Sequence, residues 1–141
     1  MIIRHEFPPN FGAILKVFPK AKGKAVIFTY GDTLYVPYPI PLSQAILAHE
    51  QVHALQQEHV RPSIWWEYYL KNPRFRLQEE LAAHRAEYLA YALFNRKIRQ
   101  AQLNIIAAKL ASPLYNSMIT KKAAKQLLRI CPKEKEYYEI S

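Results

Sequence analysis

Cysteine, glycine and acidic residues are scarce in this chain of 141 residues. The single cysteine, Cys131, excludes an intramolecular disulfide. No apolar run approaches the length of a membrane span, and the N-terminal stretch MIIRHEFPPN lacks the apolar core of a signal peptide. These absences predict a soluble, cytoplasmic protein without a membrane partner. The length predicts one domain over residues 1–141.

Acidic residues are outnumbered by basic ones. The chain has 11 aspartates and glutamates against 20 lysines and arginines, which gives a formal net charge of +9 and a pI of about 9.7. This charge favours acidic partners, so nucleic acid is one candidate partner. No dense Lys/Arg run marks a nucleic-acid interface, however, and a solvated basic surface explains the composition equally well. The aromatic residues between positions 65 and 69 are expected in the core rather than stacked on nucleobases.

The three glycines and six of the ten prolines all precede residue 42, so strands and turns are expected in the first third of the chain. Residues 25–30 and 33–36 are β-branched and aromatic, which predicts two strands. Gly31 and Asp32 between them predict a type II′ hairpin turn. Residues 11–18 are expected to form a third strand, although Asn10 before them would also cap a helix.

After residue 42 the pattern is helical. Ser43 and Thr120 are expected to cap helices, and Pro62 and Pro73 to stand at the first positions of two others. The expected helices cover residues 44–57, 62–69, 73–97, 100–111 and 121–130. The predicted fold class is therefore α+β, with a small N-terminal β-sheet and hairpin followed by a helical bundle.

The stretch HEQVH, residues 49–53, has the pattern HExxH. On a helix, His49 and His53 are four residues apart, so both imidazoles can reach one ion from the same face. Glu50 beside them can take the proton of a water held at that ion. Ionisable groups on a helix with apolar neighbours need partners, and a metal supplies them. The motif predicts a metal site with two histidine ligands and Glu50 as the catalytic residue.

One candidate for the third protein ligand is His59. It stands ten residues after His49, which is the spacing of the HExxHxxGxxH motif. That motif has a glycine where this chain has Gln56, and glutamine favours a continuing helix over a turn. On a continuing helix, His59 would point away from His49 and lie about 9 Å beyond His53.

The other candidate is a glutamate on the helix expected over residues 73–97. Glu80, His84 and Glu87 lie at i, i+4 and i+7, so they share one stripe of that helix. Small residues at positions 82 and 83 permit close approach to the HExxH helix. Glu80 and the adjacent Glu79 are both candidate ligands. Glu87 is expected on a solvated face, and His84 is either a packed histidine or a group that supports the site.

Four segments together resemble a known family: HEQVHALQQ, IWWEYYL, NPRFRLQEELAAHRAEY and ASPLYNSMITKKAAKQLLR. They look like the small minimal-gluzincin, zinc-metallopeptidase-like proteins of tailed phages, prophages and bacteria, over most of the chain after residue 33. In that family the third ligand is the glutamate of an ExxA(Y/H) pattern. The resemblance therefore implies a zincin-like fold with zinc held by His49, His53 and Glu80, while Glu79 offers a shifted match to the pattern.

The resemblance implies a zinc metallopeptidase that hydrolyses a peptide or protein substrate with Glu50 as general base. A donor for the transition state is expected among His84, Arg85 and Tyr88, and the strand expected over residues 33–36 is expected to border the cleft. The alternative is a non-catalytic, zinc-stabilised structural or interaction protein on the same scaffold, such as a virion component that contacts phage structural proteins. A phage origin would locate the protein in the host cytoplasm or the virion.

Overall fold

The computed structural model describes residues 1–130, and within them the protein is α+β and mostly helical. Cys131 lies outside the described residues. The elements in chain order are β1 (Ile2–Arg4), α1 (Phe11–Val17), a 3₁₀ turn η1 (Pro19–Lys22), β2 (Phe28–Tyr30), β3 (Thr33–Tyr35), α2 (Gln44–His59), α3 (Pro62–Lys71), α4 (Pro73–Leu89), α5 (Arg96–Leu110), a 3₁₀ turn η2 (Pro113–Tyr115) and α6 (Lys121–Leu128). Among these helices, none combines the length and apolar character that crossing a membrane requires.

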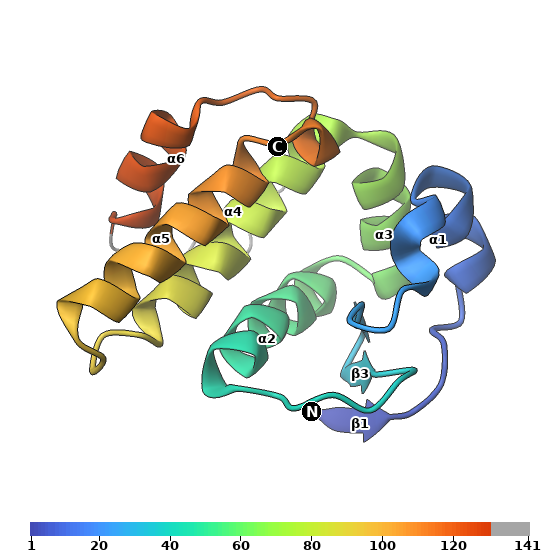
Figure 1. Cartoon of the computed structure of the whole chain (residues 1–141). Helices are drawn as coiled ribbons and strands as arrows, with labels where there is room; N and C mark the ends of the chain where they lie inside the picture. The colour runs from blue at the N-terminus through green and yellow to red at the C-terminus, as the bar shows by residue number, and fades with distance from the viewer. Residues whose placement is uncertain (131–141) are drawn as a thin grey trace.

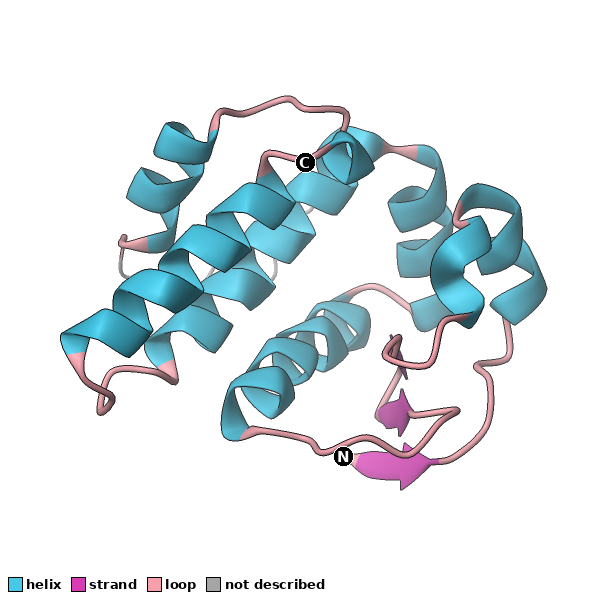
Figure 2. Ribbon diagram, viewed as in Figure 1, coloured by secondary structure: helices cyan, strands magenta, loops and turns pink. Residues whose placement is uncertain are grey.

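The three strands form one sheet in the order β1-β3-β2 (Figure 2). β2 and β3 form the predicted hairpin, with Tyr30 paired to Thr33 across the two-residue turn. Gly31 has a φ of +64°, which a type II′ turn requires at its first central position and which glycine adopts without strain. β1 pairs with β3 in parallel and was not expected from the sequence.

The strand predicted over residues 11–18 is wrong, because this segment forms helix α1. Its apolar residues Phe11, Ile14, Leu15 and Phe18 recur at i, i+3, i+4 and i+7, which is the spacing of one helix face. All four are at least partly buried, and Ile14 is 2% exposed. The helical period therefore prevailed over the β-propensity of the segment.

The single helix predicted over residues 73–97 is also wrong at its C-terminal end. α4 stops at Leu89, and α5 begins at Arg96 after a turn. The side chain of Asn95 caps α5 by accepting a hydrogen bond of 2.9 Å from the backbone N–H of Ile98. The helix starts predicted at Ser43 and Thr120 are confirmed, because both side chains accept a backbone N–H of the following helix.

Helices α2 and α4 make the most extensive contact between any two elements, and α5 and α6 cover the side of α4 away from α2 (Figure 1). One apolar core lies between α4, α5 and α6 and includes Leu103, Ile106 and Leu110. A second, aromatic core joins α1, α3 and the hairpin through Trp65 and Phe75. The α2–α4 interface itself holds only a small apolar cluster of Val52, Ala82 and Ala83. The polar residues of the HExxH motif therefore lie between two larger apolar cores.

Candidate metal centre

Helix α2 turns its ionisable residues inward. His49, Glu50 and His53 are 8%, 8% and 5% exposed, whereas Leu55 on the same helix is 38% exposed. Burying three ionisable side chains is unfavourable unless each has a partner of matching chemistry. The partners come from α4, which packs against the same face of α2.

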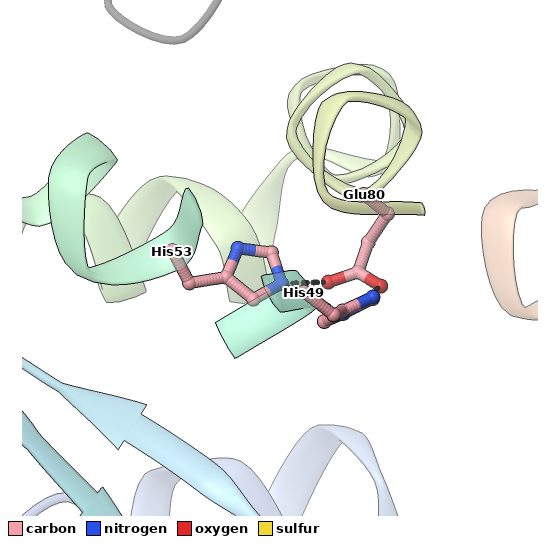
Figure 3. A group of neighbouring side chains, drawn as sticks. All are labelled: His49, His53 and Glu80. Atoms are coloured by element: carbon pink, nitrogen blue, oxygen red, sulfur yellow. Dashed lines mark hydrogen bonds and ion pairs between the residues drawn. The ribbon is translucent and has the colours of Figure 1, made fainter. Parts of the chain in front are cut away.

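Glu80 of α4 supplies the carboxylate that meets both histidines (Figure 3). Its Oε1 lies 2.7 Å from Nε2 of His53, and its Oε2 lies 3.6 Å from Nε2 of His49. The two Nε2 atoms are 3.2 Å apart. These ligand atoms are all within 4.8 Å of one another, so the three residues could hold a metal ion. Glu80 is 7% exposed, which keeps the cluster away from bulk water.

The far side of each motif imidazole faces a polar side chain, although only His53 makes a hydrogen bond there. Nδ1 of His53 lies 2.8 Å from Oε1 of Gln56, while Nε2 of Gln56 donates to the carbonyl oxygen of Glu79. The amide orientation of Gln56 is therefore set, and Nδ1 of His53 must carry the proton. Nδ1 of His49 lies 3.0 Å from Oε1 of Glu87. Metal-binding histidines usually donate their second ring N–H to an acceptor, as His53 does here, which directs the Nε2 lone pair toward the ion. The Glu87 carboxylate is close enough to His49 for the same role, but its contact with Nδ1 lacks hydrogen-bond geometry.

Electrostatics tie His53 to Glu80 when no metal is bound. Burial alone would lower the pKa of His53, but the Glu80 carboxylate outweighs it and raises this pKa to about 9. Burial alone would likewise raise the pKa of Glu80, but the imidazoles of His53, His49 and His84 together hold it well below its usual range. A positive charge at this position is thus strongly favoured, and a divalent cation would supply it.

Glu50 lies beside these ligands with one oxygen engaged. The hydroxyl of Thr29 on β2 donates to Oε2 of Glu50 at 2.6 Å. Glu50 lines the same pocket as His49, His53 and Glu80, so its carboxylate can act on a molecule bound there. Thr29 holds the carboxylate in place without neutralising it, which suits a proton acceptor.

The pocket over this cluster has a volume of about 210 Å³. Two phenols enter it: Tyr69 and Tyr115 donate to the two oxygens of Glu80 at 3.3 and 3.2 Å. Burial, reinforced by the charge of Glu80, raises the pKa of both hydroxyls, so both keep their protons and act as donors. Sequence reasoning missed these tyrosines because Tyr115 lies 35 residues from Glu80 and no local pattern links them.

The transition-state donors expected from the sequence do not line this pocket, although His84 contacts Glu80 as a residue supporting the site would. His84 contacts Glu80 at 3.5 Å and Glu87 at 3.3 Å, and Arg85 donates to the carbonyl oxygen of Leu127. Tyr88 packs against the core between α4, α5 and α6. None of the three expected donors lines the pocket, whereas the hydroxyls of Tyr69 and Tyr115 do.

The alternative third ligands are not part of the cluster. Glu79 belongs to neither group of residues that could hold a metal, and its Oε1 instead accepts a hydrogen bond of 2.8 Å from Nε1 of Trp65. Burial raises the pKa of Glu79 to about 7. α2 continues unbroken to His59, which is exposed and belongs to neither group of residues that could hold a metal. Gln56, at the position where a turn glycine was needed, is instead a buried hydrogen-bonding residue.

Glu87 is not on a solvated face as expected. It joins His49 and His84 in a second group whose ligand atoms could hold a metal ion. Its side chain is 15% exposed. Burial alone would raise the pKa of Glu87, but the imidazoles of His49 and His84 outweigh this effect and lower the pKa to about 2. The two groups share His49 but use opposite ring nitrogens. Glu87 therefore has the position of a residue that orients His49 for the first group.

The sheet meets the site through β2, not through β3. β3 is the central strand, so the expectation that it borders the cleft is wrong. Because Tyr30 pairs with Thr33 at the turn, the backbone groups of Thr29 point away from β3. Gln57 occupies this outer edge: it donates to the carbonyl of Thr29 at 3.0 Å and accepts from the N–H of Gly31 at 2.7 Å.

The chain matches no protein-family model, no curated protein and no solved structure. Two imidazoles and a carboxylate that converge beside a second carboxylate are the defining feature of the site.

Proposed function

We propose that this protein is a zinc-dependent peptidase of the minimal-gluzincin type, with His49, His53 and Glu80 as the residues that would hold the ion. The observation that carries the proposal is that both Nε2 atoms and the Glu80 carboxylate converge where Glu50 lines the same pocket. Two imidazoles and one carboxylate are a donor set that zinc accepts in catalytic sites. When bound, zinc would acidify water and polarise a carbonyl oxygen.

Glu50 is the residue that moves the proton in this proposal. Its Oε2 is held by Thr29, which leaves Oε1 to accept a proton from water and return it to the leaving amine. Tyr69 and Tyr115 keep their protons and lie in the pocket, but each has one proton and donates it to Glu80. If a metal ion engaged the oxygens of Glu80, either hydroxyl could turn to donate to the oxygen on which negative charge develops. The burial of the cluster strengthens each of these interactions.

A non-catalytic, zinc-stabilised structural or interaction protein is the second candidate function. The observation that favours it is the size of the metal pocket, because about 210 Å³ is below the roughly 300–1,000 Å³ usual for ligand sites. In that case the cluster would stabilise the α2–α4 interface, and partners such as phage structural proteins would bind elsewhere on the surface.

The substitution Glu50→Gln separates the two functions. For the peptidase, zinc-loaded Glu50→Gln should lose at least about 100-fold of the rate on a peptide mixture followed by mass spectrometry, because general-base catalysis contributes about that much. Glu58→Gln, an exposed change on the same helix, should leave the rate unchanged. The zinc content of wild type, Glu50→Gln and Glu58→Gln must be measured and must be equal for the rates to be compared. If neither wild type nor Glu58→Gln cleaves any peptide while both bind zinc, the structural function holds.

A further inference from the structure

A second cavity adjoins the metal pocket. Its volume is about 540 Å³, which falls within the usual range of roughly 300–1,000 Å³ for ligand sites. Five residues line both cavities: Ile27, Phe28, Trp66, Tyr69 and Leu114. The two cavities therefore share a wall that runs from the β2 segment across α3 to η2. A molecule bound at the metal pocket is adjacent to the second cavity.

Tyr69 shows how close the two cavities are. Its hydroxyl reaches Glu80 in the metal pocket at 3.3 Å. Its ring makes an edge contact with the ring of Phe18, at 6.4 Å between centroids, and Phe18 lines only the second cavity. The side chain of Tyr69 thus spans the distance between the metal ligands and the apolar cavity. A substrate residue of similar length, with its backbone at the metal pocket, can therefore place its side chain in the cavity.

The second cavity is apolar except at one position. Among the residues of segment 1–130 that line it, Lys20 alone is charged, and the others are aliphatic, aromatic or proline. Val17 and Leu114, which also line it, are 43% and 45% exposed, so the cavity opens to solvent at these residues. Exposed apolar surface of this kind, joined to a polar site, is typical of a pocket that binds a ligand.

Building on the proposed peptidase function, we propose that this cavity is the specificity pocket of the enzyme, and that it receives a large apolar side chain next to the bond at the metal pocket. Leucine, methionine and phenylalanine match its lining. Lysine and arginine are disfavoured because the cavity is mostly apolar and because Lys20, an exposed residue at its rim, would repel a second cation. The cavity wall from α1 and η1 is what confines the side chain.

Binding in the absence of turnover tests the pocket directly. Zinc-loaded Glu50→Gln is titrated by calorimetry with the peptides Ac-Ala-Ala-Xaa-Ala-NH₂, in which Xaa is Phe, Leu, Ala or Lys. The Phe and Leu peptides should bind about 10- to 100-fold more tightly than the Ala peptide, which corresponds to burying one large apolar side chain. The Lys peptide should bind no more tightly than the Ala peptide.

Substitutions at the rim, made in the same Glu50→Gln protein, locate the preference. Val17→Trp should reduce the advantage of the Phe peptide at least fivefold, because the added ring fills the opening. Lys20→Glu should strengthen binding of the Lys peptide about fivefold. Lys22→Glu is the matched control, since it makes the same charge change on the same turn outside the cavity and should change nothing. Circular dichroism establishes that each variant is folded.

The outcomes separate this inference from the proposed function. Equal binding of all four peptides, or binding of none of them, overturns the specificity pocket. Unchanged preferences in both Val17→Trp and Lys20→Glu overturn it as well. If zinc-loaded wild type cleaves no peptide but the binding preferences appear as stated, the pocket stands and the peptidase activity fails. If the wild type cleaves peptides but shows no preference for Phe or Leu, the peptidase activity stands and the specificity pocket is overturned.

Discussion

At the scale of single residues, Glu80 has an unusual set of neighbours. Its carboxylate lies within 3.6 Å of three imidazoles and two phenols, and all five side chains are at most partly exposed: His49, His53, His84, Tyr69 and Tyr115. A buried carboxylate needs a positive charge nearby. Protonated His53 provides that charge in the metal-free protein, and a bound metal ion would take its place.

This exchange predicts a pH dependence of stability for the metal-free protein. Because Glu80 raises the pKa of His53 to about 9, above the ordinary histidine value of 6.5, the pair stabilises the fold fully below pH 6.5. That contribution should be lost as the pH rises through 9, by at most about 3 kcal/mol in the free energy of unfolding. Urea unfolding at pH 6.5 and pH 9.5 in the presence of a chelator measures it.

The control for this pH dependence is zinc itself. Zinc-saturated protein should show little loss of stability over the same interval, because His53 is neutral in both the bound protein and the unfolded chain above pH 6.5. Equal stability of the metal-free protein at both pH values would contradict the coupling between His53 and Glu80.

Glu87 provides a second prediction at this scale. Glu87→Gln should weaken zinc binding about 10- to 100-fold without abolishing it, because it orients His49 and does not take part in the first ligand group. Competition with a fluorescent chelator gives the affinity. Glu67→Gln, an exposed change on α3, serves as the control. Two zinc ions per wild-type chain and one in Glu87→Gln would show instead that Glu87 belongs to a metal site of its own.

At the scale of elements, local patterns predicted the helices that carry the site. The Ser43 cap predicted the start of α2, and the position of Glu80 predicted the face of α4 that meets it, although Glu87 on the same stripe was wrongly expected in solvent. Contacts between distant segments could not be predicted in this way. β1 is three exposed residues whose position depends on parallel pairing with β3, and η2 brings Tyr115 to Glu80 only in the folded chain.

The contact between Gln57 and the edge of β2 is a prediction about elements. Gln57→Leu should lower the free energy of unfolding by about 1–3 kcal/mol, because it leaves the N–H of Gly31 without its acceptor and removes one donor to Thr29. Chemical unfolding measures the loss. Gln51→Leu, an exposed change on the same helix, should alter stability by less than about 0.5 kcal/mol. Equal effects of the two substitutions would mean that Gln57 does not hold the hairpin to α2.

At the scale of the whole molecule, the candidate metal centre lies where two cores meet. α4 contributes Leu77 to the core with α5 and α6, and Phe75 to the aromatic core with α1 and α3. The interface between α2 and α4 has little apolar surface of its own, and polar contacts to Glu80 join the two helices. A metal ion at this position would therefore stabilise the packing of the two halves of the molecule.

This arrangement predicts that zinc raises the thermal stability of the protein as a whole. A free zinc concentration of 100 times the Kd should add about 2.7 kcal/mol to the free energy of unfolding. Differential scanning calorimetry, with zinc and with excess chelator, measures the shift. His53→Ala should abolish the shift, whereas His5→Ala, a substitution near the N-terminus, should retain it. An identical shift in both variants would place the zinc elsewhere.

The most direct test of the metal centre is the zinc content per chain, measured by mass spectrometry of dialysed wild type, Glu80→Gln, Glu79→Gln and His59→Ala. The two glutamates are adjacent on α4 but point to different partners, Glu80 to the histidines and Glu79 to Trp65. We predict one zinc in wild type, in Glu79→Gln and in His59→Ala, and its loss in Glu80→Gln. Zinc retained in Glu80→Gln, or absent from the wild type after incubation with the metal, would contradict a centre built from His49, His53 and Glu80.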